Sequence, residues 1–503
     1  MSGTLVAVVV LGVYAASLVL LALFGLHRYR LLLAARRARP PAAPANPGVW
    51  PLVTVELPIY NEFHVVHRLL AAVAALDYPL DRLEIQVLDD SDDDTAELAA
   101  AAVARLAATG LAISHVRRER RTGFKAGALA HGLALARGEF VAIFDADFVP
   151  PADFLRRTIP HLAADPRLGM VQARWGHLNR QASLLTEVQA LLLDGHFAVD
   201  QRGRYAAGLY FNFNGTAGVW RRSAIEAAGG WQSDTLTEDL DLSYRAQLAG
   251  FRFAYLDDLV VPAELPADVN AFKSQQRRWA RGSLQTARKL LPRIAAAPVA
   301  TRLKLEAVVH LCGNLAWPLL AVLAVLSPPA LVAGLAHGGP LSTALHGLAF
   351  VLGTLSVVSF YVAAMRGPGA RRRLAYLPVL MAVGAGLALT NGLAVGAALL
   401  GRGGDFVRTA KTGRAGVEPG RYRGSLDVVW LLELAFAAYF AVAMAYAWDE
   451  GLYLTLPFFA MFLCGFGGMG IASLLTATRR YRWRSGAKPG EGATVVGRAL
   501  PAD

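Results

Sequence analysis

The sequence is poor in cysteine and in charge. Among 503 residues there are two cysteines, Cys312 and Cys464, and both lie in apolar stretches, which argues against a disulfide framework and against a cysteine-based metal site. Charged residues make up 17% of the chain, whereas a soluble protein carries about 25%. Hydrophobic residues make up 55% and concentrate at the N-terminus and after residue 305. This pattern is typical of a membrane protein.

Two further signals are missing. The motif G-x-G-x-x-G does not follow the first predicted strand, which argues against a dinucleotide cofactor. The net charge is +12, yet the basic residues lie beside the apolar stretches, and they form no basic-aromatic module of the kind that binds nucleic acid. Membrane topology therefore explains the charge better than a nucleic-acid partner does.

The apolar stretch 5–26 has no Lys or Arg before it and is followed by five arginines between residues 28 and 39. A signal peptide has the opposite order, and this stretch is long enough to cross a hydrocarbon core of about 30 Å. We therefore predict that residues 1–40 form a transmembrane anchor. Its N-terminus is expected outside the cell, with the chain entering the cytoplasm.

Residues 50–300 have the pattern of an α/β domain. Predicted strands at 53–57, 84–88, 113–116 and 140–144 alternate with helices, which favours a parallel sheet with ligands at the carboxyl ends of the strands. Asp145 and Asp147 follow the last strand and point the same way if the extended geometry continues. Two such carboxylates suit a divalent ion that also holds phosphate oxygens. Taken alone, the pair is better explained as a polar strand end.

Two helices are expected at the edge of this domain. Residues 183–200 have apolar side chains at helical spacing, and residues 269–292 form a basic amphipathic helix. Both patterns suit a membrane surface. Ordinary packing against the domain explains the first helix equally well, whereas the second precedes an apolar stretch and so favours the membrane surface.

The second half of the chain, 303–478, is predicted to be a transmembrane region with apolar stretches at 305–327, 341–365, 374–400, 427–447 and 451–475. Clusters of Lys and Arg place 366–373, 401–424 and the tail 479–503 in the cytoplasm. Both ends of 374–400 then lie on one side. We expect a re-entrant or interface-lying element there, broken near Thr390–Gly392. The alternative is a sixth crossing that violates the charge rule.

Six short motifs follow one another along the chain. Each alone has a duller explanation, such as a turn, a helix N-cap or a surface helix. They are Pro58-Ile-Tyr-Asn-Glu62, Leu88-Asp-Asp-Ser91, Phe124-Lys-Ala-Gly-Ala128, Asp145-Ala-Asp147, Thr237-Glu-Asp239 and Gln275-Gln-Arg-Arg-Trp279.

In this order, and before membrane spans, the motifs resemble those of the family 2 glycosyltransferases. The likeness is greatest to membrane polysaccharide synthases such as cellulose synthases and cellulose-synthase-like (gluco)mannan synthases, and it covers about residues 50–480. It implies a Rossmann-like GT-A fold of the nucleotide-diphospho-sugar transferases, joined to an α-helical transmembrane bundle. It also implies inverting transfer of a hexose from a nucleotide sugar.

The resemblance implies a role for each motif. Asp239, next to Glu238, resembles the general base that takes the acceptor proton; inversion needs only one such base. Asp145 and Asp147 are expected to meet Mg²⁺ or Mn²⁺, with Asp147 the stronger candidate for a direct ligand. The acceptor is expected at Asn214, Gly215 and Trp279. The nucleotide sugar is expected at Tyr60, Glu62, Asp90, Lys125, Asp145, Gln275 and Arg278.

The segment Phe406-Val-Arg-Thr-Ala-Lys411 resembles the gating loop of cellulose synthases, with Thr409 and Lys411 over the nucleotide. Arg408 and Ala410 depart from that pattern. The implied partners are a nucleotide-sugar donor, a glycan acceptor and the lipid bilayer, with room for accessory export subunits. The expected location is a bacterial inner or plasma membrane, with the catalytic domain in the cytoplasm.

The sequence leaves three hypotheses for the activity. The first is a processive synthase that uses UDP-glucose or GDP-mannose and exports its β-linked product. The second is a non-processive enzyme that glycosylates diacylglycerol, ceramide or polyprenyl phosphate. The third, a transporter with a degenerate domain, is disfavoured because the acidic motifs are complete.

Overall fold

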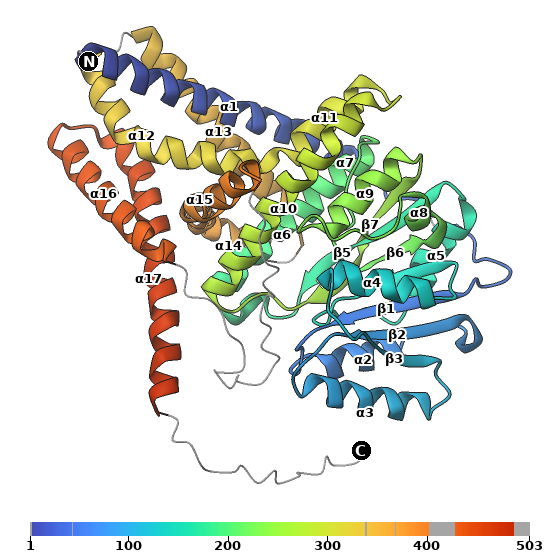
Figure 1. The fold of residues 1–503 in the computed structure, drawn as a ribbon. Helices are drawn as coiled ribbons and strands as arrows, with labels where there is room; N and C mark the ends of the chain where they lie inside the picture. The colour runs from blue at the N-terminus through green and yellow to red at the C-terminus, as the bar shows by residue number, and fades with distance from the viewer. Residues whose placement is uncertain (1–2, 43, 338–339, 368, 402–427, 487–503) are drawn as a thin grey trace.

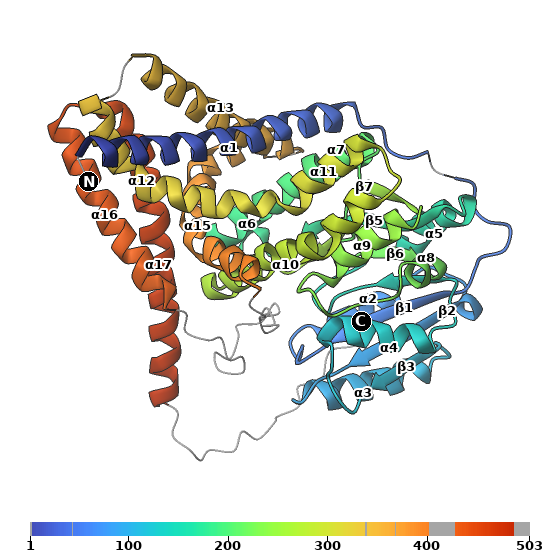
Figure 2. The same cartoon turned by 45° about the horizontal axis from the view of Figure 1, so that its top comes forward.

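The computed structural model describes residues 3–42, 44–337, 340–367, 369–401 and 428–486. An α/β domain lies on one side of the molecule and a set of long apolar helices lies on the other (Figures 1 and 2). Helix α1 (Gly3–Arg37) belongs to the apolar set although it comes first in the chain. The two parts meet along the helices that follow the sheet in sequence.

One sheet of seven strands forms the centre of the α/β domain. Its order is β3-β2-β1-β4-β6-β5-β7. The strands are β1 (Val53–Ile59), β2 (Leu83–Asp89), β3 (Ile113–Arg117), β4 (Phe140–Ile143), β5 (Leu168–His177), β6 (Gly218–Arg221) and β7 (Arg252–Ala263). The first four pair in parallel, as the alternating pattern predicts.

Helices cover both faces of the sheet. One core contains α2 (Val66–Ala74), α3 (Thr95–Ala107) and α5 (Phe154–Ala164), which pack on β1 residues such as Val55. The other core contains α4 (Phe124–Leu135), α8 (Arg222–Ala227) and α9 (Glu238–Leu248). The central strands are therefore buried on both faces, and their carboxyl ends are left as the free edge for a ligand.

The second half of the sheet differs from the prediction of a parallel sheet. Strand β6 runs antiparallel to both β4 and β5. The segment predicted as one helix at 183–200 consists of α6 (Leu184–Gly195) and a π-helical stretch (His196–Gln201) that leads into α7 (Arg202–Ala206). A π-helical turn of this kind is rare and is frequently found beside functional sites.

The remaining helices form the contact with the apolar set and the set itself. Among the described residues, five stretches are long and apolar enough to cross a membrane, and they begin at Leu5, Gly313, Ala370, Val429 and Tyr453. The helices are α10 (Val269–Ala296), α11 (Thr301–Leu311), α12 (Ala316–His337), α13 (Pro340–Ala364), α14 (Ala370–Arg373), α15 (Leu377–Leu399), α16 (Val429–Asp449) and α17 (Leu456–Gly486). These apolar helices indicate that the protein is an integral membrane protein.

The prediction of an apolar span at 305–327 with a loop after it is wrong in its boundaries. Helix α11 ends at Leu311, and α12 continues to His337 through Pro328 and Pro329. The shift has a packing cause, because Ala307 and Leu311 are buried against α10 rather than exposed to lipid. The predicted tail from residue 479 likewise begins inside α17.

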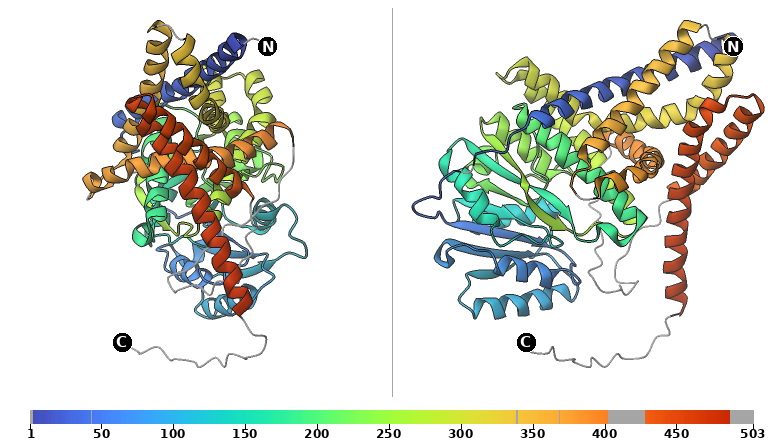
Figure 3. Two further views of the ribbon diagram at one scale, coloured as in Figure 1. Left: turned by 90° about the vertical axis from the view of Figure 1, so that its left-hand side faces the viewer. Right: turned by 180° about the vertical axis from the view of Figure 1, so that it is seen from behind.

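The predicted break near Thr390–Gly392 is also wrong, because α15 is continuous through it. Thr390 has a polar partner inside the protein: it is 0% exposed, and its hydroxyl donates to Glu433 Oε1 at 3.3 Å. Gly386 allows a close crossing, since a Cβ there would lie 2.5 Å from the carbonyl oxygen of Gly465. In the left view of Figure 3, α15 runs across the direction of α17.

Candidate active site

One cavity at the carboxyl edge of the sheet is lined by every predicted site residue that the structure describes. The nucleotide-side residues reach it from the strand ends, and the others come from the loop before β6, from the start of α9 and from α10. They are Tyr60, Glu62, Asp90, Lys125, Asp145, Asp147, Asn214, Gly215, Glu238, Asp239, Gln275, Arg278 and Trp279. Thr409 and Lys411 of the predicted gating loop lie outside the described residues.

Two arginines that the motifs did not reveal lie at the part of the cavity formed by Tyr60 and Asp90: Arg121 lines the cavity, and Arg118 binds Asp90. Asp90 accepts from Arg118 Nε at 2.9 Å and also from Arg118 NH2. The Arg121 guanidinium lies over the ring of Tyr60, with its carbon 3.4 Å from the ring centroid. A flat cation above an aromatic ring is a favourable cation–π arrangement. This side thus offers a carboxylate, guanidinium donors and an aromatic face to a base and its ribose.

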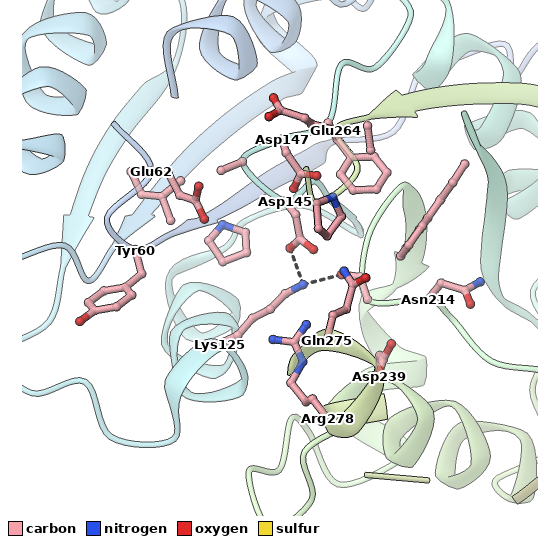
Figure 4. A pocket seen from close by; sticks show the side chains of 18 of the residues that line it. Tyr60, Glu62, Lys125, Asp145, Asp147, Asn214, Asp239, Glu264, Gln275 and Arg278 are labelled. Carbon is pink, nitrogen blue, oxygen red and sulfur yellow. Dashed lines mark hydrogen bonds and ion pairs between the residues drawn. The ribbon is translucent and has the colours of Figure 1, made fainter. Parts of the chain in front are cut away.

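The Asp145–Asp147 corner is held by backbone and by Lys125. The Asp145 N–H donates to the Thr216 hydroxyl at 2.9 Å, and Lys125 Nζ donates both to Asp145 Oδ1 and to the Gly215 carbonyl oxygen, the latter at 2.8 Å (Figure 4). Burial opposes the charge on Lys125, but the neighbouring Asp145 carboxylate raises the pKa of Lys125 above its ordinary value. The ammonium is therefore kept charged where a diphosphate would need it.

Asp147 is the more deeply placed of the two aspartates and is 7% exposed. Figure 4 shows Glu264 beside it. Arg68 NH2 contacts the Asp147 carbonyl oxygen at 3.5 Å and Glu264 Oε2 at 3.2 Å. Glu264 follows the end of β7, as Asp145 follows the end of β4, so its place after a strand was the signal that sequence reasoning missed.

The donor set of this corner fits a shared divalent ion. Among the described residues, no group of three or more His, Cys, Asp or Glu is arranged to hold a metal by itself. The carboxylates of Asp145 and Asp147 are hard oxygen ligands of the kind Mg²⁺ and Mn²⁺ prefer. An ion that takes its other ligands from a diphosphate and from water needs only one or two such carboxylates.

Asp239 stands across the cavity from the aspartate pair, in the first turn of α9. Its Oδ1 accepts from the Leu240 N–H at 2.9 Å. Burial and the adjacent Glu238 carboxylate raise the pKa of Asp239 to about 7. A carboxylate with a pKa near neutrality is well matched to accept a proton during catalysis.

Gly215 separates Asp239 from Lys125. Its φ is +80°, and a Cβ at this position would lie 3.2 Å from Asp239 Oδ2 and 3.5 Å from Lys125 Nζ. Glycine is favoured here on both counts, since the left-handed backbone disfavours a side chain and a Cβ would crowd the Asp239 carboxylate. Asn214 beside it is held through its N–H by Gln172 Oε1 at 2.9 Å.

Helix α10 brings cations and a polar stripe to the same cavity. Gln275 and Arg278 point from α10 toward Lys125 (Figure 4), and burial lowers the pKa of Arg278 from its usual value. One turn further along, Gly282 lets α10 touch the loop before the base, because a Cβ there would lie 2.5 Å from Thr237 Cγ2. The Leu236 N–H also donates to Gln285 Oε1 at 2.9 Å. Helix α10 and the Thr237–Asp239 motif therefore form one packed unit.

Comparisons with known proteins identify relatives of the α/β domain. Residues 51–282 match the model of the family described as "Glycosyltransferase like family 2". Glucomannan 4-beta-mannosyltransferase 2 of Arabidopsis thaliana is 46% identical over 249 residues, which are 49% of this chain and 47% of that protein. Glucomannan 4-beta-mannosyltransferase 1 of Oryza sativa subsp. japonica is 45% identical over 251 residues, 49% of this chain and 48% of that protein. The chain spans about half the length of these curated relatives.

One solved structure is also similar. The mannosyltransferase PcManGT from Pyrobaculum calidifontis, in complex with GDP-Man and Mn²⁺, is 25% identical, with 71% of this chain and 97% of that chain covered. Its TM-score is 0.49, too low to support an argument about the site. The family match and the seven-stranded sheet confirm the predicted GT-A fold. The α/β domain, residues 51–282, thus matches the family 2 glycosyltransferases.

Proposed function

We propose that this protein is a membrane-bound inverting hexosyltransferase that extends a β-linked polysaccharide from a nucleotide-sugar donor. The proposal rests on the lining of one cavity, which contains Asp90, Asp145, Asp147 and Arg278 as the proposed donor group and Asp239 as the proposed base. A donor bound by this group would present its sugar to Asp239. The family of the α/β domain and the names of its plant relatives support this reaction class.

The proposed chemistry uses a single base. The Asp239 carboxylate accepts the proton of an acceptor hydroxyl as that oxygen attacks the anomeric carbon, and the bond from that carbon to the diphosphate breaks on the opposite face. Lys125 and Arg278 are placed to hold the charge that develops on the departing nucleoside diphosphate. A divalent ion at Asp145 and Asp147 would supply further charge neutralisation there. Trp279 offers its ring face to the acceptor sugar.

We propose GDP-mannose as the donor and UDP-glucose as the second choice. The support is the name shared by the curated relatives, which are glucomannan 4-beta-mannosyltransferases at 46% and 45% identity. The predicted roles of Tyr60 and Glu62 in nucleoside binding fit either base. The structure supplies a cation–π pair and an Arg–Asp pair at that place, and both are compatible with a purine or a pyrimidine.

Processive synthesis and export are part of the proposal. Their support is that α10, which carries Arg278 and Trp279, packs directly on the apolar helices: Val269 and Phe272 are buried against Leu387 and Met469. A glycan leaving the cavity on this side would meet membrane helices rather than solvent. We propose the division into an anchor, a cytoplasmic domain at 50–300 and a membrane region at 303–478. In this arrangement α15 lies along the membrane interface. The proposed location of the protein is a bacterial inner or plasma membrane.

A transfer assay tests this function. Purified protein in lipid nanodiscs is incubated with Mg²⁺ or Mn²⁺ and with radiolabelled GDP-mannose, UDP-glucose or other nucleotide sugars, and the product is sized. A long glycan from GDP-mannose is the expected result. One or two sugars on an extractable lipid would support the non-processive alternative, and no transfer from any donor would contradict the proposal.

A further inference from the structure

A buried ion pair ties α10 to the apolar helices. Lys273 Nζ lies 2.7 Å from Glu433 Oε1 and 2.8 Å from Glu433 Oε2, and the two side chains are 2% and 0% exposed. Lys273 also donates to Ser473 Oγ at 3.2 Å, and the Thr390 hydroxyl donates to Glu433 Oε1 at 3.3 Å. One residue each from α10, α15, α16 and α17 therefore meets at this point.

Burying this charged cluster among apolar helices costs free energy of desolvation. Ionisable side chains inside an apolar helix bundle are expensive to bury and usually mark a function. The net gain in stability from a buried ion pair is small, because the desolvation of both charges offsets their attraction. Simple stabilisation of the bundle is therefore a weak reason for this pair, whereas fixing one arrangement of helices is a better one.

The position of Lys273 on α10 connects the pair to the cavity. Lys273 precedes Arg278 by five residues, which places the two side chains about 140° apart around the helix and about 7.5 Å apart along it. The Lys273–Glu433 pair thus holds one face of α10 against the apolar helices, while the nearly opposite face presents Gln275 and Arg278 to the cavity. A rotation or slide of α10 that broke this ion pair would also move Arg278.

A second contact at the other end of α10 shows that the helix is held along its length. Arg288 NH1 donates to the Ala398 carbonyl oxygen at 2.6 Å, and Leu284 and Ala287 are buried with Val395 and Ala398 of α15. Lys289 Nζ also lies 2.9 Å from Asp241 Oδ1 of α9, so polar contacts fix this end of α10 as well. The Lys273–Glu433 pair is directional and therefore specifies one register.

We propose that Lys273 and Glu433 are positioning residues that set the register of α10 on the apolar helices and thereby aim Arg278 at the donor diphosphate. They do not touch the donor and act through Arg278. The inference rests on the proposed function, because it takes the diphosphate to bind where Arg278 faces the cavity.

The test uses the full chain in nanodiscs and the double variant K273M/E433L, which replaces the pair with apolar side chains of similar size. We measure its melting temperature, and its KM and kcat for the donor that the wild type uses. The expected result is a melting temperature near that of the wild type, with a donor KM raised about tenfold, the size of one lost charge-assisted contact. A donor KM within twofold of the wild type in a folded protein would overturn the inference.

A double-mutant cycle tests the route through Arg278. Adding K273M/E433L to R278A should raise the donor KM less than twofold beyond R278A alone, because the contact is already gone. Independent, multiplying effects would show that the pair acts elsewhere and would overturn the proposal. If K273M/E433L fails to fold, E433D retains the charge and takes its place in both tests. Its shorter side chain should raise the donor KM about threefold, and an unchanged KM would overturn the inference.

The matched control is E306Q. Glu306 is also buried, at 4% exposure, and also joins two helices, since it accepts from His27 Nε2 at 2.7 Å and pairs with Arg30 at 2.9 Å. These partners lie on α1, and Glu306 is not among the residues that line the cavity, so E306Q should lower the melting temperature and leave the donor KM unchanged. Absence of transfer in the wild type would count against the proposed function, whereas an active wild type with unaffected pair variants counts against this inference alone.

Discussion

The donor half of the cavity is made mainly from strand ends, whereas its acceptor half is made from the loop before β6, the start of α9 and the middle of α10. Asp90 and Asp145 follow β2 and β4 in the parallel part of the sheet, whose carboxyl ends must meet at one edge. Asp239 instead depends on how α9 packs on α10 and on how α10 packs on the apolar helices. The donor half is thus fixed within the domain, while the acceptor half is fixed by contacts that leave it.

This difference predicts different kinetics for the two halves. Substitutions in the donor half should act on donor binding or on the metal, and substitutions in the acceptor half should act on the chemical step. Arg278 counts with the donor half, because it is proposed to reach the donor diphosphate from α10. The assignment of the two halves would be wrong if a donor-half variant changed proton transfer. It would also be wrong if an acceptor-half variant changed donor binding.

The largest effect is expected for Asp239→Asn. The amide keeps the shape of the side chain but cannot accept the proton, so kcat should fall about 10³-fold. Binding of the nucleoside diphosphate, measured by calorimetry, should stay within about threefold of the wild type because the donor half is intact. Unchanged transfer by this variant would misplace the base or revive a non-catalytic role for the domain.

A smaller but still large loss is expected for Asp147→Ala. Losing a metal ligand removes part of a charge stabilisation of several kcal/mol, so transfer should fall about 100-fold. Chelation of divalent ions should abolish sugar transfer by the wild type, and added Mg²⁺ or Mn²⁺ should restore the transfer. Asp153→Ala, an exposed carboxylate outside the cavity, serves as the control. Full activity in the presence of excess chelator would contradict the metal assignment.

The pH dependence probes the acceptor half without a substitution. Because the pKa of Asp239 is raised to about 7, the base is protonated and inactive below that pH. The ratio kcat/KM should therefore rise about tenfold per unit as pH increases toward 7 and level off above it. Donor binding should stay flat over the same range. A profile for kcat/KM that is level from about pH 6 to 8 would argue against Asp239 as the base.

The smallest effect is expected for Arg121→Ala in the donor half. Loss of the guanidinium above Tyr60 removes a cation–π contact at the nucleoside side, so the donor KM should rise about threefold with kcat unchanged. Arg105→Ala, an exposed arginine on α3, is the matched control. A fall in kcat without a change in KM would place Arg121 in the chemical step and blur the division between the halves.

Sequence reasoning found cavity-lining residues in both halves, and the residues that it missed lie in the donor half. The order of strands and the carboxylates after them follow from local pattern, so Asp90, Asp145 and Asp147 were found. Arg118, Arg121 and Glu264 were missed because their roles arise from tertiary pairing with Asp90, Tyr60 and Arg68. Glu264 shows that a lone carboxylate after a strand carries too little signal without a motif.

The apolar half of the chain was predicted in outline and corrected in detail. Hydropathy locates apolar stretches but does not say which of their residues face protein, so α11 was merged with the span that follows it. The polar triplet Thr390–Gly392 suggested a break, yet burial against Glu433 allows the helix to continue. Pairing of polar groups across helices is a tertiary property, and no window of sequence contains both partners.

The anomeric configuration of the product tests the central claim most directly. A single base, Asp239, across the cavity from the metal-binding aspartates leads to inversion at the anomeric carbon. NMR spectroscopy of the glycan made from an α-linked nucleotide sugar should therefore show β linkages. A product with α linkages would require a second nucleophilic step that this arrangement of one base does not provide, and it would contradict the account.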